Sequence, residues 1–382
     1  MREVVVLGIG MHKVGHFPDK TNLELGRNAT LGALRDAGME FKDLQFAYFS
    51  RNKADPTASI GEMMLGRMGL TGMPVVNLEN DSCSGSSAFW LAYNAVAFER
   101  YDIALAVGVE KPVLPPSMSP PPPPATAYEV ALGAMGIADI STKAALAMRR
   151  RMHDCGETVE QFARVAVKNR KNATHNPYAQ RQKEVTLEEV LKSQPICDPL
   201  SSLQCCPSAS EGCAAAVLCS KDVARRYQGD KFITVASAVL KTASEFTGTV
   251  VLTIPGLSKA TADEAYNIAG IGIRDVDLIE LCDPFTVNEV IHYENLGLCG
   301  QGEGGRIVSE GQTEIAGEKP VNTDGGLLAR GHPLGCTGLY QIAELVLQLR
   351  GEAGPRQVEG AKVGLAHLEG SGPVASVIIL KG

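Results

Sequence analysis

The chain has 382 residues, of which 45% are hydrophobic, 21% charged and 5% aromatic, and its formal net charge is -7. A single core stops growing at roughly 250–300 residues, so we expect a globular chain with two core units. The acidic balance, without basic clusters interleaved with aromatic residues, argues against nucleic-acid binding. No apolar run approaches the ~18–20 residues that a membrane helix needs, so we expect no membrane span.

The ten cysteines are spread thinly along the sequence and form no paired C-x-x-C ladder. This distribution is typical of free thiols in a reducing compartment and argues against a disulfide framework or a zinc knuckle. The first ten residues, MREVVVLGIG, read as a strand and not as a secretion signal. We therefore predict a cytoplasmic protein with no resident metal.

Short β-rich runs alternate with helix-length segments in the first part of the sequence. Strands are expected at 4–10, 74–80 and 102–110, and helices at 21–38 and 86–100. Strands separated by helices need crossover connections. The alternation therefore predicts an α/β fold with a mostly parallel sheet.

The chain is expected to consist of two similar α/β halves around an insertion. The first half comprises 1–111 and 205–231, the insertion 112–204, and the second half 232–382, where the strand–helix alternation returns. The run Pro120 to Pro124 supplies no backbone donors, so it belongs on the surface as a spacer, a lid edge or a partner-docking strip. The helical stretches that follow predict an inserted helical cap.

A first candidate site lies between the expected strand at 74–80 and the helix at 86–100, where the chain reads DSCSGSS (81–87). A turn of small residues exposes a side chain at the sheet edge, and a helix N-terminus favours a thiolate there. Cys83 is therefore a candidate nucleophile. The alternative is that Cys83 is a small buried residue at a packing point.

Three further polar turns follow strands in the second half. His332 precedes an apolar helix, where its imidazole can take a proton from a nucleophile or simply cap the helix. Cys282 and Asp283 end another strand, Asn288 opens the next helix, and His367 enters a glycine turn. Open α/β sheets bind ligands at the carboxyl ends of their strands, so these turns are expected to meet at one site.

Together these motifs resemble thiolases, most closely the sterol-carrier-protein-type thiolases, which make or cleave 3-oxoacyl-CoA. The resemblance covers nearly the whole chain. It implies a duplicated five-layered α/β/α/β/α thiolase fold with a helical loop domain inserted in the first half. The most specific stretches are NPYAQ (176–180), LQCCPSASEGCAAAVL (203–218), NEVIHYENLGLC (288–299) and GGLLARGHPLGCTG (325–338).

The resemblance also implies residue roles. One cysteine attacks the acyl-CoA carbonyl, a histidine activates it, and a second cysteine shuttles the α-proton. The first two roles fall on Cys83 and His332, but an ungapped alignment from Asn77 places Ser82 at the nucleophile position instead. Both registers remain open at this stage.

The sequence departs from the family where the second cysteine is expected, because that position is Pro284. A proline has no titratable side chain, so Cys282, two residues earlier, either takes over the proton transfer or is inert. His367 stands where the last loop of the family carries a histidine. Further substrate or oxyanion-loop positions implied by the resemblance are Asp283, Asn288, Gly331 and Gly370.

Three functions fit these observations. The first is a thiolase-type acyl-CoA acyltransferase that forms or cleaves a 3-oxoacyl-CoA through an acyl-cysteine, with coenzyme A or acyl-CoA as substrate and no permanently bound cofactor. The second is a carbon–carbon lyase acting on a β-hydroxyacyl-CoA such as a steroid side chain, together with an OB-fold acyl-CoA-binding partner. The third is a non-catalytic CoA-ester or lipid-binding module, for which the Gly-His-Pro motif has no purpose. The resemblance also implies fatty acid or steroid degradation and a homodimer or dimer of dimers.

Overall fold

The structure is a computed structural model that describes residues 1–51, 59–111, 127–137, 139–207, 209–228, 232–243, 256–370 and 373–382. The proline run at 120–124 lies outside the described residues. No helix in the described ranges is long and apolar enough to cross a membrane.

Local capping signals set the ends of α1 (Asn22–Ala37), which matches the helix expected at 21–38. The Thr21 side chain accepts a hydrogen bond from the Glu24 backbone, and the Glu24 carboxylate accepts one from the Thr21 N–H. Gly38 ends the helix at φ 67°, a left-handed conformation that glycine adopts without a Cβ penalty. The predicted helix is confirmed to within one residue at each end.

The first half of the chain forms the strand order β3-β2-β4-β7-β1. β3, β2, β4 and β1 point the same way and β7 is reversed, so the strand directions are mostly parallel, as expected. Only two of the four pairings are parallel, because both pairings of β7 are antiparallel. The bounds are β1 (Val4–Met11), β2 (Phe46–Arg51), β3 (Val75–Leu78), β4 (Ile103–Glu110) and β7 (Gly212–Ser220).

The second half repeats this plan in mirror order, β8-β11-β10-β9. Only β11 is antiparallel here, and a parallel bridge between Ile279 and Val321 supplies the position that β3 occupies in the first half. The two sheets meet where β1 and β8 pair through two residue pairs. The bounds are β8 (Ile233–Thr242), β9 (Leu278–Glu280), β10 (Val363–Gly370) and β11 (Val374–Lys381).

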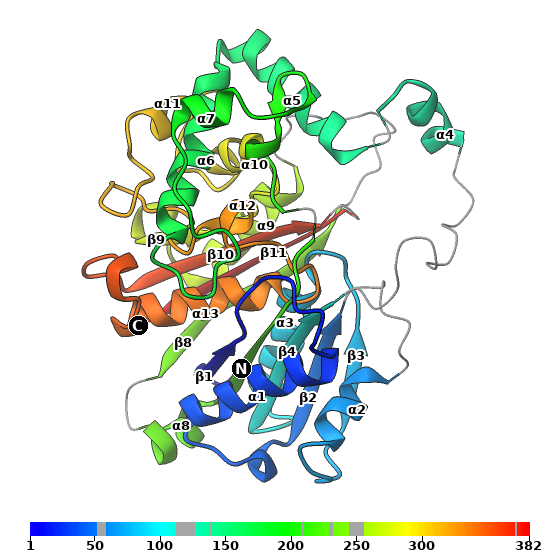
Figure 1. The fold of residues 1–382 in the computed structure, drawn as a ribbon. Helices are drawn as coiled ribbons and strands as arrows, with labels where there is room; N and C mark the ends of the chain where they lie inside the picture. Colours follow the sequence, from blue (N-terminus) through cyan, green and yellow to red (C-terminus); the bar gives the residue numbers. More distant parts are fainter. Residues whose placement is uncertain are drawn as a thin grey trace.

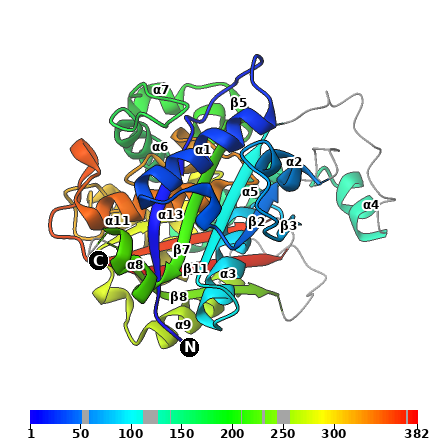
Figure 2. The same cartoon turned by 90° about the horizontal axis from the view of Figure 1, so that it is seen from below.

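Two helices, α3 (Ser84–Ala97) and α13 (Thr337–Arg350), fill the layer between the sheets (Figure 1). They approach closely because Gly338 has no side chain: a Cβ there would lie 2.0 Å from the Ser86 Oγ. Outside the first sheet lie α1, α2 (Ile60–Gly66) and α8 (Lys221–Gln228), and Figure 2 shows α1 crossing its strands. Outside the second lie α9 (Leu257–Ala269) and α10 (Thr286–Asn295). The predicted duplicated, five-layered fold is confirmed.

The described part of the segment 112–204 is largely helical and packs on the second half. Phe162 and Val165 of one inserted helix share a buried cluster with Val290 of α10. Figure 1 shows this inserted helix, labelled α6, beside α10. The inserted elements are α4 (Ala127–Ala134), α5 (Ile140–Cys155), α6 (Val159–Ala173), α7 (Leu187–Leu191), β5 (Pro195–Cys197) and β6 (Leu200–Ser201). The short helices α11 (Gly304–Ser309) and α12 (Gly326–Ala329) contact α6 from the second half. The exact domain boundaries stay a prediction.

Candidate active site

Polar residues from both halves meet where the central helices begin. Ser82 follows β3 and precedes α3, and its Oγ lies 3.3 Å from the Nε2 of His332, which precedes α13. Ser82 is 6% exposed. The structure therefore brings a hydroxyl of the first half against an imidazole of the second, at the carboxyl-terminal ends of the strands.

The hydrogen bonds of His332 define which ring nitrogen carries the proton. The Thr337 hydroxyl donates to the Pro333 carbonyl at 2.9 Å, so its oxygen accepts from the His332 Nδ1–H at 2.9 Å. Nε2 then keeps its lone pair and accepts the Ser82 O–H. Burial lowers the pKa of His332 to about 4, so the ring is neutral at pH 7 and can act as a base.

The backbone around His332 is held firmly. Its N–H donates to the Ser210 Oγ at 3.0 Å. The preceding Gly331 has φ 108°, and a Cβ there would lie 2.7 Å from the Val14 side chain. Only glycine fits this conformation and this space, so Gly331 positions the imidazole without touching the reacting atoms.

The Cys83 thiol makes its hydrogen bonds to β10 and β11, and none to His332 among the described residues. It is fully buried, and its Sγ donates to the backbone carbonyls of Leu368 at 3.5 Å and Val374 at 3.7 Å. Loss of solvent raises the pKa of the thiol to about 12. The expectation that the helix terminus lowers this pKa is wrong, because burial disfavours the thiolate more than the helix dipole favours it.

Cys282 lies in the same apolar cluster as Cys83, together with Leu327. Its Sγ donates to the backbone carbonyl of Glu369 at 3.4 Å, and burial raises its pKa well above the usual range. At neutral pH Cys282 is therefore a protonated thiol, which can donate a proton but cannot accept one until it has lost its own. The neighbouring Pro284 carbonyl accepts from the Cys206 N–H, which fixes this turn to the first half.

The predicted loop positions have different environments. The Asp283 carboxylate accepts from the N–H groups of Leu327 at 2.7 Å and Leu328 at 3.3 Å, so it anchors α12 and is a positioning residue. Asn288 has a side-chain oxygen that is buried without a partner among the described residues. A Cβ at Gly370 would lie 2.8 Å from the Val374 side chain, so a larger residue there would force that side chain to shift.

Among the described residues, His367 shares no hydrogen bond with Ser82 or His332. Its ring packs against that of His292 with centroids 4.5 Å apart and the ring planes tilted by 58°, and its Nε2 lies 2.8 Å from the Ser258 Oγ. Burial lowers the pKa of His367 well below its usual value. The Ser258 hydroxyl also reaches the Glu369 carboxylate at 2.5 Å.

Comparison with known proteins places the chain in a family. Residues 4–222 match the thiolase N-terminal domain and residues 242–381 the thiolase C-terminal domain-like family. An acetyl-CoA acetyltransferase of Methanothermobacter thermautotrophicus is 39% identical over 389 residues, which cover 99% of each chain. Sterol carrier protein 2 of Bos taurus is 36% identical over 99% of this chain and 72% of its own.

A solved structure titled Ltp2-ChsH2(DUF35) aldolase matches with a TM-score of 0.84 and 26% identity, covering 100% of this chain and 98% of the other. The chain belongs to the thiolase superfamily. The predicted resemblance to sterol-carrier-type thiolases and the predicted class, a thiolase-type acyl-CoA acyltransferase, are confirmed.

Within this thiolase, sequence reasoning missed the residues that contact the candidate groups from other elements. Three of them lie within the family-like stretches at 203–218, 288–299 and 325–338, but the sequence assigns none of them a role, and only the fold brings them to the site. They are Thr337 and Ser210 around His332, and Ser258, His292 and Glu369 around His367.

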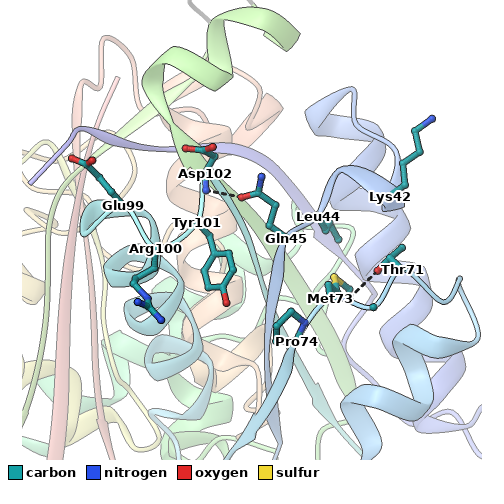
Figure 3. Close-up of a pocket in the computed structure, with 11 residues that line it drawn as sticks. Lys42, Leu44, Gln45, Thr71, Met73, Pro74, Glu99, Arg100, Tyr101 and Asp102 are labelled. Atoms are coloured by element: carbon teal, nitrogen blue, oxygen red, sulfur yellow. Dashed lines mark hydrogen bonds between the residues drawn. The ribbon is translucent and has the colours of Figure 1, made fainter.

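A surface hollow of about 560 Å³ lies at the opposite edge of the first sheet of the thiolase (Figure 3). Its walls include Gln45 before β2, Pro74 before β3, and Tyr101 and Asp102 before β4. These residues stand at the amino-terminal ends of the strands, whereas Ser82 follows a carboxyl end. The hollow is therefore distinct from the candidate active site.

Proposed function

We propose that this thiolase transfers an acyl group from acyl-CoA through Ser82, not Cys83. The observation that carries the proposal is the 3.3 Å contact between the Ser82 Oγ and the unprotonated Nε2 of a neutral His332. The Cys83 thiol is hydrogen-bonded to the backbone carbonyls of Leu368 and Val374 instead. The ungapped sequence register also supports Ser82.

The proposed step is balanced within these groups. The Ser82 Oγ attacks the thioester carbonyl of acyl-CoA while His332 Nε2 takes its proton. The tetrahedral intermediate then expels the coenzyme A sulfur, which receives that proton from His332, and leaves an acyl ester on Ser82. The family resemblance assigns the oxyanion contact to the loops that carry Asn288, Gly331 and Gly370. Coenzyme A is the leaving group and no bound cofactor takes part.

Intact-mass measurement after exposure to acyl-CoAs of several chain lengths tests this proposal. The expected result is one acyl adduct that maps to Ser82, resists neutral hydroxylamine as an ester does, and disappears in Ser82→Ala. The matched control is Cys83→Ala, which keeps the adduct. An adduct that neutral hydroxylamine removes, and that Cys83→Ala abolishes, would restore the acyl-cysteine mechanism.

A second candidate function is the carbon–carbon lyase. Two observations favour it: the similarity to a solved aldolase in which a thiolase-like chain and a DUF35 chain occur together, and Pro284 at the proton-shuttle position. In this case Ser82 is not acylated, and the chain splits a β-hydroxyacyl-CoA with an OB-fold partner. Absence of an acyl adduct, combined with cleavage that depends on an added OB-fold protein, would select the lyase.

The assembly and location remain proposals. A homodimer or dimer of dimers is supported by β3, an edge strand of the first sheet with Val76 41% exposed, since an open strand edge invites pairing with another copy. Light scattering at micromolar concentration is expected to give at least twice the 40.5 kDa of one chain. Cytoplasmic location rests on the thin distribution of free cysteines.

A further inference from the structure

Two histidines and one carboxylate from separate elements converge beside the thiol cluster. His292 lies on α10, and His367 and Glu369 lie at the end of β10. One ligand atom from each of the three lies within 4.8 Å of the others. Both histidines are buried, at 4% and 0% exposure, while Glu369 is half-buried.

The hydrogen bonds leave a nitrogen of His367 without a partner. The Ser258 hydroxyl donates to the Glu369 carboxylate, so its oxygen accepts from the His367 Nε2–H. Nδ1 therefore keeps its lone pair, and it is buried with no hydrogen-bond partner among the described residues. A buried lone pair without a donor is costly unless something binds it.

His292 can present a second lone pair in the same way. Its Nδ1 lies 3.2 Å from the amide nitrogen of Asn295, whose amide oxygen is buried without a partner. Turning that amide by 180° exchanges its two atoms, a choice that the hydrogen-bond network decides. The oxygen then accepts the His292 Nδ1–H and leaves Nε2 unprotonated.

We propose that His292 Nε2, His367 Nδ1 and the Glu369 carboxylate form a divalent transition-metal site, with Zn²⁺ as its occupant. Two imidazoles and one carboxylate are a known ligand set for zinc, with a fourth position left for water or substrate. In such sites each ligating histidine donates its other N–H to a neighbouring oxygen. Ser258 and Asn295 supply those two oxygens here.

The geometry needs only a small contraction to hold the ion. Zinc–ligand bonds of 2.0–2.2 Å place tetrahedral ligand atoms about 3.4 Å apart, so the cluster closes by roughly 1.4 Å at most. Glu369 can move toward the two imidazoles because its side chain is half-buried at the end of β10, whereas the separation between the two imidazoles has to close by small movements of the rings themselves. The sequence gives no warning of such a site, since its three ligands share no spacing motif and the expectation was of no resident metal.

Metal titration of the full chain tests the site independently of the proposed function. After treatment with a chelator, the protein is titrated with Zn²⁺ alone and, separately, with Co²⁺, whose visible spectrum reports the ligand types. We expect one equivalent of either ion, with a nitrogen–oxygen spectrum. Glu369→Gln, which keeps the shape and the Ser258 contact, should weaken binding at least ~100-fold. His292→Asn should do the same.

The matched control is His153→Asn, because His153 is an exposed histidine of α5 with 83% of its side chain accessible. This variant should bind the ion as the wild type does. Binding unchanged in Glu369→Gln and His292→Asn, or no stoichiometric binding at all, would overturn the proposal. A strong sulfur-to-cobalt charge-transfer band would overturn it too, because it would place the ion on cysteines.

Discussion

The two central helices begin alike in the two halves of the fold. Cys83 is the N-cap of α3 and Cys336 the N-cap of α13, and both are fully buried. The Cys336 thiol donates to the carbonyl of Pro333, three residues earlier, at 3.5 Å, whereas the Cys83 thiol donates to the carbonyl of Leu368 in the other half. Because a cysteine occurs at the equivalent position in both halves, we infer that its role there is packing.

The residue before each cysteine differs between the halves. In the second half it is Gly335, where a Cβ would lie 2.5 Å from the Val109 carbonyl, so the position is closed by packing. In the first half it is Ser82, whose hydroxyl reaches His332. Both halves thus have a buried cysteine at the N-cap of the central helix, and they differ at the residue before it. This difference supports Ser82 as the reacting residue.

The strongest test of this difference between the two halves is to remove the Ser82 hydroxyl and each N-cap thiol in turn. Ser82→Ala should lower acyl-enzyme formation by about 10⁴-fold or more, as expected for loss of a nucleophile. Cys83→Ala and Cys336→Ala should cost stability, about 1–3 kcal/mol each, and leave the acylation burst in place. Rapid-quench measurement of the burst with denaturant melts separates the two effects. A lost burst in Cys83→Ala would contradict the assignment.

Cys282 extends the comparison to a third strand end. If carbon–carbon bonds form or break here, Cys282→Ala should leave the acylation burst intact and slow carbon–carbon turnover by ~10²–10⁴-fold, the usual contribution of a positioned acid or base. Steady-state turnover measured beside the burst checks this, since mutations partition differently between the two steps. If both the burst and the turnover of Cys282→Ala match those of the wild type, Cys282 is structural, and His367 becomes the next candidate to carry the proton.

The pH dependence of stability tests the buried, neutral His332. Its folded pKa of about 4 is below the unfolded value of 6.5, so between these values the unfolded chain holds the extra proton. Stability therefore falls as the pH drops from 6.5 to 4, by about 3 kcal/mol from this group. His332→Gln should remove that part of the slope in urea melts at several pH values. A variant with the wild-type slope would show that His332 titrates normally.

The smallest effect expected is in thiol labelling. Cys155 is exposed, whereas Cys83 and Cys336 are buried with raised pKa values. Limited iodoacetamide treatment with peptide mapping should label Cys155 first and leave both N-cap cysteines unmodified. If Cys83 were labelled early and Cys336 were not, the two cysteines would not be equivalent, and Cys83 would again be the candidate nucleophile.

The sequence predicted the fold well because hydrophobic periodicity and capping are local. The helix at 21–38 and the strand at 102–110 appear nearly as expected, bounded by residues such as Thr21 and Gly38. The single reversed strand in each half was not predictable, since β7 and β11 acquire their direction from partners far along the chain.

The sequence predicted which turns form the site, but not which side chains in those turns contact one another. Motifs gave Ser82, Cys83 and His332, but which side chain faces the imidazole depends on how the α3 cap packs against β10 and β11, a tertiary contact that leaves no sequence signal. For the same reason the lowered thiol pKa expected for Cys83 was wrong. The contacts of His292 and Glu369 with His367 arise only when α10 and β10 come together.

The place of β1 in the sheet has a consequence for the order of events during synthesis. Val5 pairs with Cys219 on one side and Thr234 on the other, so the strand has no sheet partner until more than two hundred later residues exist. At 5–20 residues per second the ribosome takes about 10–40 s to make them. Throughout that interval an apolar, unpaired VVVLGIG segment is available to other nascent chains. The long-range pairing of this strand therefore lengthens the time for which the nascent thiolase is exposed to aggregation.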